Sequence, residues 1–167
     1  MVAAGNDTTR YSITAGLAAL MERPALYDAL PSMTLDERKA LVEEMLRWAS
    51  VTMHFRRTAT SDTELGGRPI AAGDKVVIWF VSANFDEGHF DEPYEFRPAR
   101  TPNDHVTFGL HSPHLCLGAH LARLEMRVVF EEIAARWSRV TSAGPPERLR
   151  SNFISGVKSL PVRVTWR

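Results

Sequence analysis

Apolar residues recur at helical spacing in three long segments of the chain. In the first, from Val2 to about Arg23, four apolar residues are spaced to share one helix face: Ile13, Leu17, Leu20 and Met21. This period predicts an amphipathic helix. Pro24 ends or interrupts that helix, because proline has no backbone N–H to donate. A shorter helical stretch follows to Leu30, and Pro31 and Ser32 break the pattern.

The first helix has no capping residue before it. Helices usually begin after Ser, Thr, Asp or Asn, whereas residues 2–4 are already apolar and helix-compatible. Two explanations stay open: a frayed terminus, or a chain that begins in the middle of a longer helix. The polar residues Asp7, Thr8 and Thr9 inside the helix favour the second explanation.

The second segment predicts a helix from Leu35 to Trp48. Thr34 precedes it, and Glu37 follows three residues later, which is the spacing of a capping box. Glu44 and Arg47 lie three residues apart and therefore share one face of this helix.

The third segment, Leu117 to Trp137, has the clearest helical pattern. Four of its apolar residues are predicted to share one face: Leu121, Leu124, Val128 and Ile133. Before it, residues 84–115 have few periodic apolar positions and many turn-forming residues. Such a long irregular stretch is usually functional in a compact domain.

Strand character is confined to short runs. Residues 53–65 are predicted to form one strand, with a turn at Gly66 and Gly67 and a second strand over Lys75–Phe80. A final pair of strands is predicted over Asn152–Ile154 and Val162–Trp166.

Composition narrows the class of protein. The chain has 167 residues, of which 44% are apolar, and its 20 basic and 20 acidic residues cancel. This length fits one domain, and a zero net charge predicts no binding to nucleic acid or to an anionic membrane. No apolar run is long enough for a membrane span, and the first residues do not have the pattern of a secretory signal. We therefore expect a cytoplasmic protein.

The candidate chemistry lies around the only cysteine, Cys116, just before the third helix. A lone cysteine is most often an inert buried residue. A zinc site is a second explanation, but only His111, His114 and Cys116 cluster, without a fourth ligand. The third explanation is one thiolate binding a metal that brings its other ligands, as haem iron does.

The residues around Cys116 resemble a known family. The segment FGLHSPHLCLGAHLARLE, Phe108 to Glu125, resembles the haem-thiolate loop and following helix of cytochrome P450. Other parts resemble, in the family's order, the oxygen-activating helix, the Glu-x-x-Arg helix, the strand carrying a propionate-binding arginine, the meander and the C-terminal hairpin. These segments are Ala4–Thr9, Glu43–Trp48, Phe55–Val77, Phe96–Thr101 and Phe153–Arg163.

The resemblance implies a role for each matching residue at the haem. Cys116 would be the proximal iron ligand, whose thiolate favours O–O cleavage. Arg57 and His114 would pair with the haem propionates. The other cofactor-binding residues implied by the loop motif are Phe108, Gly109 and Gly118.

The resemblance also implies catalytic and bracing residues. Asp7 and Thr8 would be the acid–alcohol pair that delivers protons during oxygen activation. A buried ionic cluster would brace the proximal side through Glu44, Arg47 and Arg100. For His105, contact with a propionate and plain packing of the loop are equally open.

The loop before Cys116 departs from the common family pattern. Phe108 lies one residue farther from the cysteine, a longer spacing similar to that of bacterial lipid- and sterol-hydroxylating members. Those members usually have glycines where this chain has Leu110, His111 and Ser112. Glycine permits backbone angles that other residues avoid, so the sequence does not fix the geometry of this loop.

The resemblance starts at the family's central helix, and earlier helices are absent. It implies one partial P450 domain over residues 1–167, mainly α with small β-hairpins and truncated at the N-terminus. The expected function is a haem b-containing (iron protoporphyrin IX) monooxygenase that acts on a small organic or lipid substrate with a ferredoxin-like electron donor. The alternative is a non-catalytic haem-binding half, or remnant, that needs a separate N-terminal chain.

Overall fold

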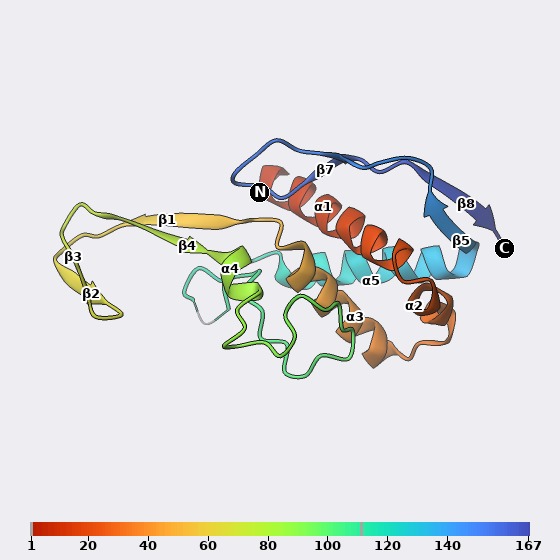
Figure 1. The fold of residues 1–167 in the computed structure, drawn as a ribbon, viewed down its shortest axis with the longest axis horizontal. Helices are drawn as coiled ribbons and strands as arrows, with labels where there is room; N and C mark the ends of the chain where they lie inside the picture. The colour runs from red at the N-terminus through yellow and green to blue at the C-terminus, as the bar shows by residue number, and fades with distance from the viewer. Residues whose placement is uncertain (1, 111) are drawn as a thin grey trace.

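Three long helices form the body of the molecule in the computed structural model, which describes residues 2–110 and 112–167 (Figure 1). They are α1 (Val2–Met21), α3 (Leu35–Ala49) and α5 (Ala119–Arg136). Shorter helical segments connect them: α2 (Pro24–Ala29), a 3₁₀ turn (Leu30–Ser32) and α4 (Phe80–Asn84). Thr34 and Glu37 form the predicted capping box at the start of α3.

The strands form four separate antiparallel pairs. Strand β1 (His54–Thr58) pairs with β4 (Lys75–Trp79), and β2 (Thr63–Leu65) pairs with β3 (Arg68–Ile70). The C-terminal pairs are β5 (Trp137–Ser142) with β8 (Val162–Trp166), and β6 (Glu147–Arg148) with β7 (Val157–Ser159). The fold class is therefore mainly α with small β-hairpins, as the sequence predicts.

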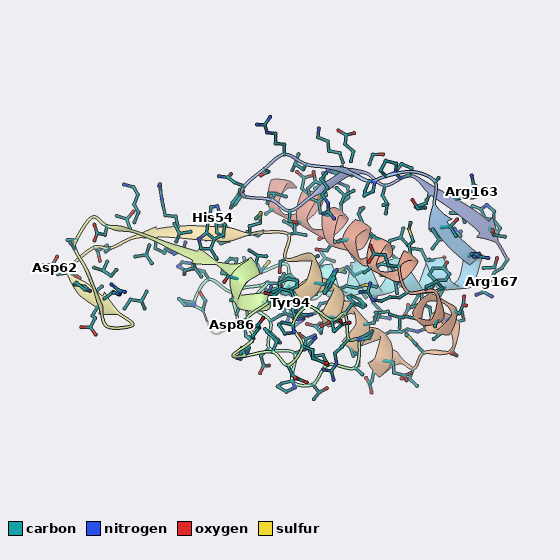
Figure 2. All side chains as sticks on the ribbon, viewed as in Figure 1. His54, Asp62, Asp86, Tyr94, Arg163 and Arg167 are labelled. Carbon is teal, nitrogen blue, oxygen red and sulfur yellow. The ribbon has the colours of Figure 1, made fainter. Side chains whose placement is uncertain are left out.

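An arm built from β1 and β4 extends away from the helices and carries β2 and β3 at its end (Figure 1). Figure 2 places His54 on the β1–β4 part of the arm and Asp62 at its far end. The predicted single strand over 53–65 is wrong. Ala59 donates its N–H to the Asp74 carbonyl, and Asp62 accepts the N–H of Ala72. These bonds turn the chain between β1 and β2.

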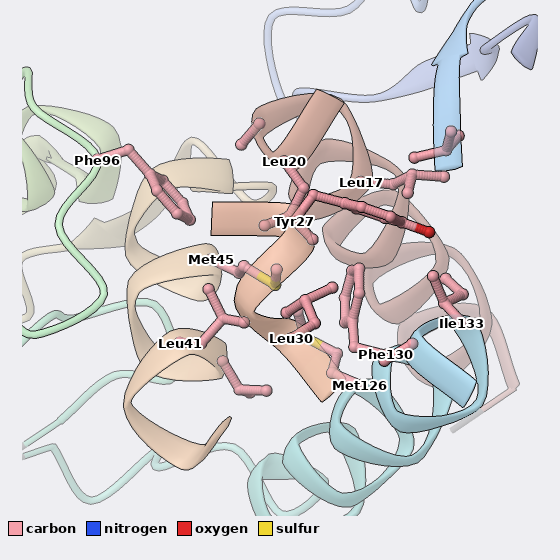
Figure 3. Packing of buried hydrophobic residues seen from close by; sticks show 14 of the residues in the cluster. Leu17, Leu20, Tyr27, Leu30, Leu41, Met45, Phe96, Met126, Phe130 and Ile133 are labelled. Carbon is pink, nitrogen blue, oxygen red and sulfur yellow. The ribbon is translucent and has the colours of Figure 1, made fainter. Parts of the chain in front are cut away.

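The core lies where the three long helices meet (Figure 3). Leu20, Met45 and Met126 contribute one fully buried side chain from each helix. Gly16 on α1 allows the close approach, because a Cβ there would lie 2.8 Å from Met45 Sδ. Packing of apolar faces, rather than helix propensity, is the main source of helix stability in such a body.

The buried face of helix α5 differs from the one that the sequence predicts. Of the four apolar residues predicted to share a face, only Ile133 is buried, and the other three are exposed: Leu121, Leu124 and Val128. The buried face carries Met126, Phe130, Ile133 and Ala134. Apolar residues therefore occupy opposite sides of the helix, and periodicity alone does not identify the side that packs.

The final strand pair also differs from the prediction. Strand β8 pairs with β5, directly after α5, and not with residues 152–154. Ile154 forms only an isolated bridge with Thr52. The residue predicted to end the third helix, Trp137, instead begins β5. Across the described ranges, no helix is both long and apolar enough to span a membrane.

Candidate functional site

A cavity of about 500 Å³ lies between α1, the base of the arm, and the loop that leads into α5. Its size is within the range of small-molecule and cofactor sites. Its walls are largely apolar and include Phe55, Phe108 and Met126. Hydroxyl groups line it as well, and the side chains that could ligate or pair with a cofactor come from separate parts of the chain: Arg57, His114 and Cys116.

Cys116 presents an exposed, free thiol on the cavity wall. Its backbone N–H donates to the Phe108 carbonyl at 2.9 Å, and its own carbonyl accepts the N–H of Ala119 at 3.2 Å. A Cβ at Gly118 would lie 3.8 Å from the sulfur. The first two contacts fix the backbone of Cys116, and a Cβ at Gly118 would be in ordinary van der Waals contact with the sulfur.

The loop before Cys116 consists of successive turns. The Gly109 N–H donates to Val106, and its carbonyl accepts from Ser112. Gly109 has a φ of 73°, a conformation that favours glycine. Leu110 does not have a positive φ, so its position does not require glycine. His111 lies outside the described residues.

Two nitrogen-bearing side chains border the cavity. Arg57, on β1, is exposed and donates from Nη1 to the Arg56 carbonyl at 3.1 Å. Within the described part of the chain, no carboxylate forms an ion pair with Arg57. His114 is also exposed and lines the cavity from the loop before Cys116. A guanidinium and an imidazole at the rim suit a ligand that carries carboxylates.

Helix α1 brings one of the two predicted catalytic residues to the cavity. Thr8 lines it, and the Thr8 hydroxyl donates to the Ala4 carbonyl at 2.6 Å. The Asp7 carboxylate is exposed, accepts from Arg10 at 2.8 Å, and is not among the lining residues. The sequence interpretation missed Ser12, which lines the cavity one helical turn after Thr8. Their i,i+4 spacing was the available signal.

The predicted ionic cluster is confirmed. Glu44 and Arg47 are fully buried, and Arg47 holds both carboxylate oxygens of Glu44 at 2.8 and 2.9 Å. Arg100 adds a contact to Glu44 at 3.2 Å. Arg47 also donates to carbonyls of the irregular stretch, at Asn84 and Pro93. The cluster therefore fixes the irregular stretch to α3.

A second cluster, of Glu43, His105 and Arg123, was not predicted. Glu43 accepts from His105 at 3.0 Å and from Arg123 at 2.7 and 2.9 Å. Partial burial alone would raise the pKa of Glu43. The hydrogen bonds from His105 and Arg123, with their charges, outweigh burial and lower this pKa from 4.5 to about 2. His105 is buried and does not line the cavity, so its contact is with Glu43.

The described residues around the cavity do not form a metal-binding cluster of their own. Among the residues that the structure describes, no three His, Cys, Asp or Glu side chains are grouped to hold a metal ion. The zinc explanation depended on His111, which is outside those residues. The cavity instead brings together the Cys116 thiol, the Arg57 guanidinium and the His114 imidazole on a largely apolar lining.

Comparison with known proteins identifies the family. The cytochrome P450 family model matches residues 27–164, and the chain belongs to the cytochrome P450 family. A methyl-branched lipid omega-hydroxylase of Mycobacterium tuberculosis is 48% identical over 166 residues, which are 99% of this chain and 38% of that protein. A steroid C26-monooxygenase of Rhodococcus jostii is 41% identical and is matched over 97% of this chain and 34% of that protein.

Solved structures agree with this assignment. CYP108D1 from Novosphingobium aromaticivorans has a TM-score of 0.92 and 43% sequence identity, over 98% of this chain and 39% of that chain. A Mycobacterium marinum cytochrome P450, CYP268A2, has a TM-score of 0.90 and 43% sequence identity, over 95% of this chain and 38% of that chain. The chain thus spans roughly two fifths of the length of these relatives and corresponds to a C-terminal part of the P450 fold.

The family implies a haem cofactor, and the cavity fits one. An iron ligand needs an accessible thiolate, and Cys116 is an exposed thiol on the wall. A macrocycle needs apolar surface, and the lining is largely apolar. Propionates need cationic or hydrogen-bonding partners at an edge, and Arg57 and His114 lie at the rim.

Proposed function

We propose that this chain is the haem-thiolate part of a bacterial monooxygenase. The observation that carries the proposal is the exposed Cys116 thiol, on the wall of an apolar cavity that has Arg57 and His114 at its rim. The cofactor proposed is haem b. When bound, it supplies the iron centre at which dioxygen is activated, with electrons from a ferredoxin-like partner, to place one oxygen atom into a C–H bond of the substrate.

The residues around Cys116 would hold and orient the cofactor. Cys116 would bind the iron through its sulfur, and its hydrogen bond to Phe108 fixes the backbone that carries the sulfur. Arg57 and His114 would bind the haem propionates. Gly109 and Gly118 leave the space beside the loop and the sulfur open, since neither adds a side chain.

Residues of α1, on the side of the cavity formed by this helix, would transfer protons. Thr8 holds a proton at Oγ1, directed at the Ala4 carbonyl, and lines the cavity. Asp7 lies one residue away on the exposed side, paired with Arg10. In this proposal, Asp7 exchanges protons with solvent, and rotation of its side chain or of Thr8 passes them to the cavity.

The substrate class is proposed from the relatives. Two of them are a methyl-branched lipid omega-hydroxylase and a steroid C26-monooxygenase. A largely apolar cavity is consistent with an aliphatic or steroid-like substrate. We therefore propose a lipid-like substrate oxidised at a C–H bond.

A second candidate is a haem-binding half that works with a separate N-terminal chain. The observation that favours it is an exposed apolar stripe, which consists of Leu121, Leu124 and Val128 on α5 and Leu117 just before the helix. Leu117 is 89% exposed. A helix that is apolar on opposite sides is usually covered on both, and the relatives are more than twice as long as this chain.

Haem release from two arginine variants tests the proposed site. Arg56 and Arg57 are adjacent and exposed on β1, but only Arg57 lines the cavity. We expect Arg57→Ala to release haem to an excess of a haem-scavenging protein about tenfold faster, because a charge-assisted bond to a carboxylate is lost. Arg56→Ala should match the unmodified chain. Equal release rates for both variants would contradict the assignment of Arg57.

A further inference from the structure

Glu43 connects the helix α3 to the loop that carries Cys116, without touching the cavity itself. We propose that Glu43 is a positioning residue, which fixes the Cys116 loop through Arg123 and Phe108. The ordering of the loop is a property of the chain alone. Its consequence for iron ligation rests on the proposed function.

The first link joins two helices. Both carboxylate oxygens of Glu43, on α3, accept hydrogen bonds from Arg123, on α5, at 2.7 and 2.9 Å. Their side chains are 28% and 35% exposed, so water only partly screens the pair. A bidentate bond of this kind fixes the plane of a guanidinium as well as its position.

The second link joins Arg123 to the loop. The guanidinium carbon of Arg123 lies 4.6 Å from the centre of the Phe108 ring, within the range of a cation–π contact. The carbonyl of Phe108 accepts the N–H of Cys116 at 2.9 Å. The orientation that Glu43 gives to Arg123 therefore reaches the backbone of the residue proposed as iron ligand.

His105 holds the carboxylate in this orientation. The His105 ring is buried, and its Nε2 lies 3.0 Å from Glu43 Oε2. Because an ionised carboxylate only accepts hydrogen bonds, Nε2 carries the hydrogen. Nδ1 of His105 is buried and has no hydrogen-bond partner among the described residues. The contact with Glu43 is therefore the one that orients this ring.

The neighbouring acid serves a different part of the chain. Glu44 holds Arg47 and Arg100, which bind carbonyls of residues 84–95. Two adjacent glutamates on α3 thus fix two different segments. Loss of Glu43 is expected to loosen the Cys116 loop before it loosens the body.

Amide hydrogen exchange of the unliganded chain tests the proposal. In Glu43→Gln, the exchange of the Cys116 amide should become at least tenfold faster, whereas the amide of Leu46, within α3, should change less than twofold. Glu132→Gln is the matched control, because Glu132 forms an exposed pair with Arg136 on the far part of α5. That control should leave both amides unchanged.

A double variant distinguishes positioning from general destabilisation. Since Glu43 acts through Arg123, the Cys116 amide of Glu43→Gln/Arg123→Ala should exchange within about twofold of that in Arg123→Ala alone. An unchanged Cys116 amide in Glu43→Gln would overturn the proposal. Equal acceleration of Cys116 and Leu46 would overturn it as well.

A haem-bound readout examines the consequence for ligation. The proportion of a thiolate-type spectrum in the reduced carbon monoxide complex should fall in Glu43→Gln and persist in Glu132→Gln. An unchanged proportion, beside a faster Cys116 amide, would overturn the link from loop to iron ligand. If the unmodified chain gives no thiolate-type spectrum, the proposed function fails, and the exchange experiment still decides the role of Glu43 in the loop.

Discussion

At the scale of single residues, paired charges inside the molecule connect the helices to the irregular stretch. Glu44 and Arg47 are fully buried yet satisfied by each other and by Arg100. The i,i+3 spacing on α3 predicted that the first two would meet. The spacing alone did not predict burial, because the surrounding carbonyls come from residues 37 and 46 positions away. The burial was implied only by the family resemblance.

Removal of Arg47 is expected to be strongly destabilising. Arg47→Ala leaves the buried carboxylate of Glu44 with fewer partners, and breaking a buried pair costs about 3–5 kcal/mol. Urea unfolding followed by circular dichroism measures the change. Arg136→Ala, at an exposed pair with Glu132, should cost less than about 1 kcal/mol. A loss of similar size for the two variants would contradict the bracing role of Arg47.

The stability contributed by Glu43 should depend on pH. Its folded pKa of about 2 is below its usual value of 4.5, so the contribution is complete above about pH 4.5 and is lost as pH falls through 2. For a pair about one-third exposed, we expect on the order of 2 kcal/mol at neutral pH. Urea unfolding from pH 3 to 7 should show that the difference in the free energy of unfolding between Glu43→Gln and the unmodified chain becomes smaller as the pH falls. A difference that does not change with pH would show that the carboxylate charge does not contribute this stability.

The Glu43 cluster also shows why site residues could be predicted only in part. Cys116, His114 and Arg57 were found from motifs that resemble a family, and the structure brings all three to one cavity. Glu43 and Arg123 lie 80 positions apart. Neither periodicity nor a local motif links them, so their contact became visible only once α3 and α5 were packed.

At the scale of elements, the sequence predicted where helices begin and end better than it predicted which of their faces are buried. The capping box of α3 and the proline after α1 gave accurate boundaries, because they depend on local hydrogen bonding. The packed face of α5 was wrong, because Leu121 and Leu124 match the helical period as well as Met126 and Phe130 do. Only tertiary contacts decide between two apolar sides.

Two glycines on α1 should respond in opposite directions to alanine. A Cβ at Gly16 would meet Met45 Sδ at 2.8 Å, whereas a Cβ at Gly5 would have nothing within 4 Å. Gly16→Ala should therefore destabilise the fold by about 1–3 kcal/mol through overpacking. Gly5→Ala should be neutral or stabilise it by up to about 1 kcal/mol, because alanine favours the helix. Thermal unfolding of both variants is the measurement, and stabilisation by Gly16→Ala would contradict the close packing of α1 on α3.

At the scale of the whole molecule, the body and the arm together enclose the proposed haem cavity. The sequence predicted the strands β1, β4 and β8 but not β3, β5, β6 or β7, and β8 pairs with the unpredicted β5 across residues 143–161. Turn residues predict where a hairpin bends, whereas pairing across a long connection depends on the packing of the body. The family resemblance supplied the overall architecture, and the comparisons confirm it.

The apolar stripe on α5 should make the isolated chain associate with itself. Exposed apolar patches of this kind mark interfaces or aggregation-prone surfaces. Sedimentation velocity of the chain alone should show oligomers, and Leu121→Gln/Leu124→Glu should reduce them without lowering the melting temperature. A lower melting temperature in that variant would show that the stripe packs within this chain. Unchanged association would place the contact elsewhere.

The central claim is that Cys116 ligates haem iron in this cavity. The most direct measurement is the absorption spectrum of the purified chain with haem, reduced and under carbon monoxide, compared with that of Cys116→Ala. We predict a thiolate-type Soret shift in the unmodified chain and its loss in the variant. Identical spectra for the two, with only the absorption of free haem, would contradict the account.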